Sequence, residues 1–234
     1  MDKQPKFLKE YSDEEKGAYI GAISSIATAD KEASEEEMVY LTALSDAAGL
    51  SEEQKEFVLK AAKNVNGEDL ARSLDILRAS DLKYSLVADL ISFAESDRNL
   101  TPEEKENIER IADQLEINQQ QFVLLDHFVK RTNTLQPPPE KISSPGFLSA
   151  LGLDQKFKAS GMNLKTMTKG LLGFAGPMIL ASMVRRRLGR QATKNFNLPL
   201  GGGSFGSIIS TLTGGKGFSG VGKYLRKFTR QDQI

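Results

Sequence analysis

Cysteine is absent from this sequence of 234 residues, and histidine occurs only once, as His127. Without cysteine the chain forms no disulfide and offers neither a thiolate metal site nor a cysteine nucleophile. A lone histidine gives zinc no second partner, so we expect His127 to be a packing or surface residue. The opening residues, MDKQPKFLKEYSDEEK, also lack the apolar core of a signal peptide, and we therefore expect a cytoplasmic location.

The chain has no net charge, but its charges are unevenly distributed. Residues 1–136 contain 16 basic and 28 acidic residues, a net charge of −12, whereas residues 137–234 contain 15 and 3, a net charge of +12. The join, LQPPPEKISSPG at 135–146, is rich in proline, which favours an extended spacer and interrupts a helix. We therefore predict an acidic domain at 1–136, a proline-rich linker at 137–146 and a basic, glycine-rich tail at 147–234.

The acidic domain has the sequence pattern of helices throughout. The spacing of a capping box, in which Glu or Gln follows a hydroxyl or amide residue by three positions, recurs at Ser12, Ser34, Ser51, Thr101 and Asn118. Between these caps, apolar residues recur three and four positions apart, as on one face of a helix. The pattern predicts seven helices, near 13–29, 35–48, 52–64, 68–78, 81–96, 102–115 and 119–132.

Two stretches of the acidic domain share one plan at a separation of 67 positions. We call IATADKEASEEE at 26–37 the first acidic elbow and FAESDRNLTPEE at 93–104 the second. A shift of 67 also superposes the first three predicted helices on the last three. The sequence therefore predicts an all-α fold, a compact seven-helix bundle with an internal three-helix duplication. The aligned pairs include Asp30 and Asp97, Ser34 and Thr101, and Glu37 and Glu104.

The pattern I-x-x-A-D-x-x-x-S-x-E-E of the first elbow, its echo in the second and the seven predicted helices resemble the TerB family. The resemblance covers residues 12–131. It implies a small, acidic, non-enzymatic bacterial domain associated with tellurite resistance and stress responses, which binds metal ions and works beside membrane-bound partners. The family often has glycine directly after the elbow aspartate, and this chain departs from that pattern with Lys31 and Arg98.

The elbows also invite comparison with a calcium-binding EF-hand loop. The seven-residue step from Asp to Glu in each elbow equals the step between ligand positions five and twelve of that loop. Its first ligand, however, would fall on Ile26 or Phe93, and its obligatory glycine would fall on Lys31 or Arg98. The residues at these two positions therefore exclude an ordinary EF-hand, although the spacing of Asp and Glu agrees with one.

Two interpretations of the elbows remain. The carboxylates of both elbows could meet across the bundle and bind calcium, magnesium or manganese, the divalent cations that prefer oxygen ligands. Alternatively, the hydroxyl residues and glutamates only cap helices, and the acidic first turns complement the helix dipole. The predicted metal ligands are Asp30, Glu37, Asp97 and Glu104.

The basic tail contains an apolar, helix-like segment at 163–190. Its uncharged run at 170–184 has 15 residues and includes Pro177, so it is too short and too interrupted for a spanning helix, which needs about 20 apolar residues. An apolar run followed by RRRLGR suits shallow insertion into an anionic membrane surface, or docking on a partner protein or on the bundle itself. The predicted contact residues are Leu171, Leu172, Phe174, Ile179, Arg185, Arg186, Arg187 and Arg190.

The end of the tail is rich in glycine and predicts little regular structure. GFSGVGKY at 217–224 nearly matches a phosphate-binding loop, but Tyr224 stands where a small hydroxyl must hold magnesium, so we expect no nucleotide cofactor. Basic residues interleaved with Phe218 and Phe228 are compatible with nonspecific nucleic-acid binding, although no recognised nucleic-acid fold is present.

These observations lead to one expectation and one alternative for function. The expected function is a non-catalytic TerB-like stress-response or scaffold protein, whose tail attaches to a partner protein or to the inner face of a membrane. The alternative is a nucleic-acid-associated protein that uses the same tail. We expect no small-molecule substrate, because the sequence lacks a nucleophile–base pair and a histidine cluster. The opposite charges also predict a salt-sensitive association of tail and bundle.

Overall fold

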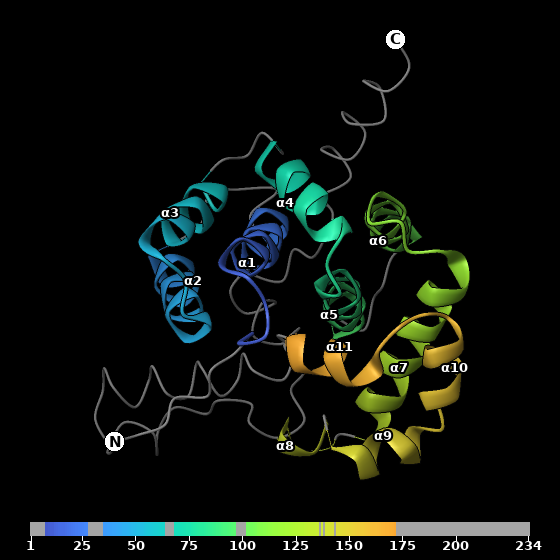
Figure 1. Cartoon of the computed structure of the whole chain (residues 1–234). Coiled ribbons are helices and arrows are strands. Elements are labelled where there is room, and N and C mark those ends of the chain that lie inside the picture. The colour runs from blue at the N-terminus through green and yellow to red at the C-terminus, as the bar shows by residue number, and fades with distance from the viewer. Residues whose placement is uncertain are drawn as a thin grey trace, which may run out of the picture.

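The computed structural model describes residues 8–27, 35–63, 68–96, 102–135, 137, 139–142 and 144–171, and every regular element in these ranges is an α-helix (Figure 1). The all-α prediction is confirmed, and the seven predicted helices match α1–α7 to within three residues at each end. Their bounds are α1 Asp13–Ala27, α2 Glu35–Ala48, α3 Glu52–Ala61, α4 Glu68–Arg78, α5 Leu82–Ser96, α6 Pro102–Gln114 and α7 Gln119–Leu135.

The seven helices form two three-helix units joined by α4. In Figure 1, α1, α2 and α3 lie together on one side and α5, α6 and α7 on the other. The first helix of each unit packs on the third and on the second, so α1 contacts α3 and α2 as α5 contacts α7 and α6. Apolar residues at positions 67 apart fill equivalent places, since Leu44 and Ile111 are both fully buried, as are Val58 and Leu125.

The turn after the second helix is the same in both units. Gly49 and Glu116, 67 positions apart, follow α2 and α6 in the left-handed conformation, with φ of 67° and 56°. The next residue of each turn donates its backbone N–H to a carbonyl five positions back, at 3.0 Å for Leu50 and 2.9 Å for Ile117. This is the Schellman arrangement that satisfies the last carbonyls of a helix. The repeated geometry supports the predicted duplication.

The start of the third helix is also repeated, and both caps agree with the sequence pattern. Ser51 accepts a hydrogen bond from the backbone N–H of Gln54 at 3.3 Å. At the equivalent place, Asn118 accepts from the N–H of Gln121 at 2.9 Å, and the Gln121 side chain accepts from the N–H of Asn118 at 3.0 Å. The second cap is therefore a complete capping box, in which two donors that the helix leaves free are satisfied.

Beyond α7 the described structure contains more helix than the predicted linker and the predicted tail with its single helix-like segment. Four short helices follow, namely α8 Pro139–Ile142, α9 Pro145–Leu151, α10 Asp154–Ala159 and α11 Leu164–Gly170. Buried residues of this region, among them Leu151, Phe157 and Met167, belong to the same hydrophobic core as α1–α7. The packed domain therefore continues to Leu171. Of these helices, α11 lies within the apolar, helix-like segment predicted at 163–190, whereas α8 and α10 have only four and six residues, too few to show an apolar period.

The repeated turn yields a stability prediction. A residue with a side chain is strained in the left-handed conformation, so Glu116→Gly should raise the free energy of unfolding by about 0.5–1 kcal/mol, and Gly49→Ala should lower it by a similar amount. Urea denaturation measures both. Glu116→Ala is the control, because it removes the carboxylate, which lies 3.9 Å from Arg78 on the surface, but keeps the strain. Equal effects of Glu116→Gly and Glu116→Ala would contradict the backbone explanation.

Candidate functional site

The two acidic elbows occupy equivalent places in the two units. The first connects α1, which ends at Ala27, with α2, which begins at Glu35. The second connects α5 with α6 in the same way, from Ser96 to Pro102. Each elbow thus joins the first helix of its unit to the second, and each second helix begins directly after the hydroxyl residue that the capping-box pattern indicates.

The predicted metal ligands lie at the limits of what the structure describes. Asp30 and Asp97 fall outside the described residues, and Glu37 and Glu104 are described only as backbone positions in the first turns of α2 and α6. The convergence of the four carboxylates therefore stays a prediction. Among the side chains that are described, no group of three or more histidine, aspartate or glutamate residues is arranged to hold a metal ion.

A buried carboxylate that the sequence analysis missed lies where the two units meet. Asp89 on α5 is 2% exposed and accepts a hydrogen bond from the hydroxyl of Tyr19 on α1, which is fully buried. A carboxylate in a core needs such donors, because burial without them carries a large desolvation penalty. The equivalent position of the first unit is Ala22, so this polar position is not part of the repeat. Its one signal in the sequence is an aspartate inside the apolar run LVADLI.

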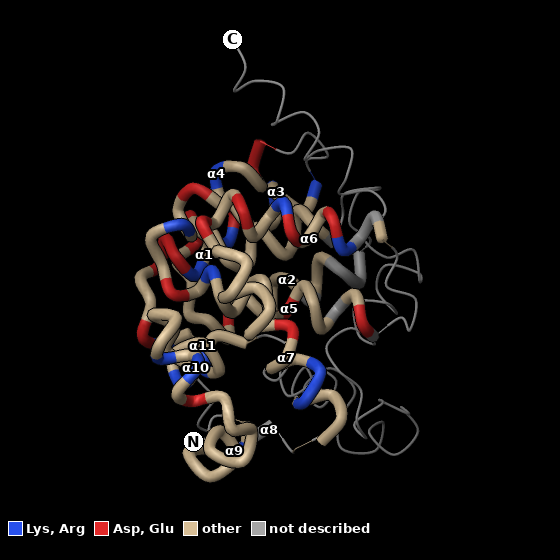
Figure 2. Tube along the Cα trace, turned by 90° about the vertical axis from the view of Figure 1, so that its right-hand side faces the viewer, with Lys and Arg blue, Asp and Glu red and all other residues tan. Residues whose placement is uncertain are grey.

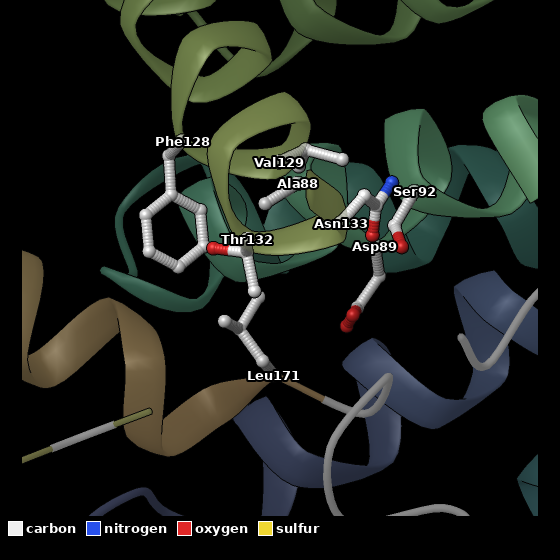
Figure 3. A pocket seen from close by; sticks show the side chains of 8 residues that line it. All are labelled: Ala88, Asp89, Ser92, Phe128, Val129, Thr132, Asn133 and Leu171. Carbon is white, nitrogen blue, oxygen red and sulfur yellow. The ribbon is translucent and has the colours of Figure 1, made fainter. Parts of the chain in front are cut away.

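A small cavity adjoins Asp89, between α5 and α7 (Figure 3). It leaves about 10 Å³ for the centre of a water molecule, which is room for one water at most. Figure 3 shows its polar side chains pointing in different directions, with the Asp89 carboxylate turned away from Asn133 and the Thr132 hydroxyl turned towards Phe128. Thr132 is 4% exposed and its hydroxyl has no hydrogen-bond partner. The cavity therefore suits neither a substrate nor a metal ion.

A charged cluster lies at the end of α5, close in sequence to the second elbow. Burial raises the pKa of Glu95 above its usual value, although a hydrogen bond from Asn133 at 3.2 Å and the nearby ammonium of Lys130 act in the opposite direction. Lys130 lies 2.8 Å from Asp126 and 3.9 Å from Glu95, and its own pKa is raised, chiefly by the hydrogen bond to Asp126. Glu95 is the third residue of the second elbow, so its hydrogen bond with Asn133 links the start of that elbow to α7.

The predicted tail contacts are described for one residue only. Leu171 is 3% exposed and lines the cavity beside Thr132, so its side chain docks on the bundle, one of the alternatives left open by the sequence. The other contact residues, from Leu172 to Arg190, lie outside the described residues, as does the glycine-rich end. His127 is exposed on α7. In the part of the chain that the structure describes, no helix combines the length and apolar character needed to cross a bilayer.

A comparison with known protein families finds a match whose residues span the two three-helix units. Residues 18–127 match the model of the family TerB, tellurite resistance protein TerB. The match runs from α1 into α7, so it includes both elbows and ends before α8–α11. No curated protein and no solved structure matches the chain.

The buried pair of Tyr19 and Asp89 yields a prediction with an internal control. Tyr19→Phe removes a hydrogen bond to a buried carboxylate and should lower the free energy of unfolding by about 1.5–3 kcal/mol. Tyr11→Phe is the matched change, because the hydroxyl of Tyr11 is buried without a hydrogen-bond partner. Its removal should leave stability unchanged or raise it by up to about 1 kcal/mol. Urea denaturation of both variants checks the difference, and equal losses would contradict it.

Proposed function

We propose, from the match of residues 18–127 to the TerB family model, that the chain is a non-catalytic stress-response module of the tellurite-resistance type. In this proposal the elbows bind a divalent cation, and the basic tail attaches the module to an anionic membrane surface or to a partner protein. The observation that carries the proposal is the family match, which contains both elbows at equivalent helix connections.

The metal part of the proposal rests on the chemistry of the elbows. In each elbow the aspartate precedes the last glutamate by seven positions, and these two pairs, among the acidic residues of the elbows, are the proposed ligands: Asp30, Glu37, Asp97 and Glu104. Carboxylate oxygens without nitrogen or sulfur ligands favour calcium, magnesium or manganese over zinc or copper. Lys31 and Arg98 place a positive charge beside each aspartate and so weaken the affinity relative to the glycine that is frequent in the family.

The absence of catalysis is part of the proposal, and two features support it. The cavity beside Asp89 leaves room for one water only, so it does not admit a substrate. The sequence contains no cysteine and a single histidine, which lies exposed on α7 and is far in sequence from either elbow. Binding without chemistry is therefore the function that these residues favour.

The attachment part of the proposal rests on the composition of the tail. Residues 137–234 carry a net charge of +12, and Arg185, Arg186 and Arg187 directly follow an uncharged run. Apolar residues next to a basic cluster bind anionic lipid surfaces by combining shallow insertion with electrostatic attraction. The same basic cluster would also bind nucleic acid. Nucleic-acid binding is the alternative function, and the vesicle experiment described below distinguishes it from membrane attachment.

Metal binding is tested by titrating the full chain with calcium, magnesium and manganese. We expect heat in calorimetry and a rise in melting temperature, because a ligand that binds only the folded state stabilises it by mass action. The double variant Asp30→Asn/Asp97→Asn should lose both signals, whereas Asp75→Asn, an exposed carboxylate on α4, should keep them. A chain that gives neither heat nor a thermal shift with any of the three ions would refute the metal site.

Tail attachment is tested by sedimentation with anionic vesicles. Changing Arg185, Arg186 and Arg187 to alanine should weaken vesicle binding about 100-fold, since each basic residue near such a surface contributes about 1 kcal/mol. A control removes three exposed lysines of α10 and α11, Lys156, Lys158 and Lys165, and should change binding far less. Binding to single-stranded nucleic acid but not to vesicles would instead favour the alternative function.

A further inference from the structure

Residues 144–171, which contain α9–α11 and which we call the strap, are held at their helix ends by side chains of α5 and α7. The last carbonyls of a helix have no partner within the helix and need one elsewhere. In each strap helix, a carbonyl in or just after the last turn receives a hydrogen bond from the bundle. The pairs are Arg131 to the carbonyl of Leu151, Gln121 to that of Ser160 at 3.0 Å, and Ser85 to that of Met167 at 2.9 Å.

Apolar contacts fill the space between these hydrogen bonds. Phe157 on α10 is fully buried and meets Phe128 on α7 edge to face, with ring centroids 6.3 Å apart at 70°. Helix α11 lies so close to α5 that a Cβ at Gly170 would approach the Ser85 hydroxyl to 2.4 Å and Leu82 to 2.9 Å. Only glycine fits there without a shift of the neighbours. The strap is therefore complementary in shape to the surface of α5 and α7.

Charge contributes little to this docking. Figure 2 shows basic residues along α10 and α11, yet the ion pair that joins the strap to the start of the chain, Lys169 with Glu10, is solvent-exposed at both ends. Exposed pairs of this kind contribute little and are screened by salt. The described part of the tail is thus held by apolar burial and by hydrogen bonds to backbone, which differs from the salt-sensitive association that the charge split predicts.

Although its buried side chains belong to the core of the domain, the strap has two properties of a docked ligand. It lies outside the residues that match the TerB family. Its helices have six or seven residues, and helices this short do not persist alone in water, so they form only when docked. A short amphipathic helix seated in an apolar groove is one of the recurring modes of peptide recognition.

The strap is joined to α7 through a segment that contains Pro137, Pro138 and Pro139. Consecutive prolines favour an extended chain rather than a return onto the preceding helix. Ile142 of this segment is buried in the same core, but none of the hydrogen bonds and ring contacts described above involves it, so those contacts form whether strap and groove belong to one chain or to two. Exchange of an identical element between copies is a low-cost route to a dimer.

We infer that the face of α5 and α7 around Ser85, Gln121, Phe128 and Arg131 is a docking groove for short amphipathic helices, filled by the chain's own strap and open to the strap of a second copy. The tether holds the strap at an effective concentration on the order of millimolar. The internal strap therefore prevails in dilute solution, and exchange between copies grows with protein concentration. The residues named for this groove are distinct from the proposed metal ligands and from Arg185, Arg186 and Arg187.

The groove is tested with the full chain carrying a protease site inserted before Pro137. After cleavage under native conditions, the fragment that begins with the strap should stay bound during gel filtration in high salt. A labelled peptide of residues 144–171 should then bind the cleaved protein as it replaces the fragment, and should bind the uncut protein at least 100-fold more weakly. Release of the fragment on cleavage would overturn the proposal, because the groove would then not hold an untethered strap. Aggregation of the bundle would overturn it as well, because the strap would then be a part that the fold cannot lose.

Peptide variants define what the groove recognises. Phe157→Ala removes the ring that meets Phe128 and should weaken peptide binding at least tenfold. Lys158→Ala, at the neighbouring exposed position, is the matched control and should bind like the unmodified peptide. Equal affinity of the Phe157→Ala and unmodified peptides would overturn the proposed groove.

Exchange between copies is tested on the unmodified full chain by light scattering over a range of protein concentrations. The fraction of dimer should rise with concentration, because exchange of the strap competes with its internal docking. A chain that stays monomeric at every concentration would overturn the second-copy occupant.

Discussion

The hydrogen bond from Tyr19 to Asp89 joins α1 to α5 at the place where the two units meet, and both side chains are buried. Helix α5 around this bond is covered on several sides, since it packs on α1, α4, α6, α7 and α11. A carboxylate in that position favours the observed pairing of the two central helices, because a buried polar group is costly when its hydrogen bonds are not made. The elbows directly follow α1 and α5, so the packing of these two helices sets where each elbow begins.

Local sequence patterns predicted the helices of the bundle well. The caps at Ser51 and Asn118 depend on residues three positions apart, and the structure has both at the predicted places. The same patterns could locate the elbows but not the relation between them, because that relation depends on how α1 and α5 pack. Asp89 left one signal, an aspartate inside an apolar run, but its partner Tyr19 is 70 positions away and could not be inferred from that run. The left-handed Glu116 is not a residue type that indicates this conformation, and only its alignment with Gly49 points to it.

The place of the strap in the fold could not be predicted for a different reason, although α11 lies in the helix-like segment predicted at 163–190. Its helices are shorter than two turns, and their ends are satisfied by Ser85, Gln121 and Arg131, which are 20 to 82 positions away in the chain. In the first unit an outer helix, α4, covers α1, and in the second unit α11 covers α5. The strap thus gives the second unit an outer helix as well. A family match that ends at residue 127 does not contain that helix, so the resemblance gave no warning of it.

The order in which these parts are synthesised has a consequence for the newborn chain. The strap ends 36 residues after α7, which is about 2–7 s of synthesis at the usual rate of 5–20 residues per second. Helical bundles rich in local contacts fold within microseconds to milliseconds. Helices α1–α7 therefore have time to fold while the apolar face of α5 and α7 is still uncovered. During those seconds the uncovered face of α5 and α7 is accessible to a chaperone, or to a neighbouring chain on the same messenger, before the strap of the same chain has been synthesised.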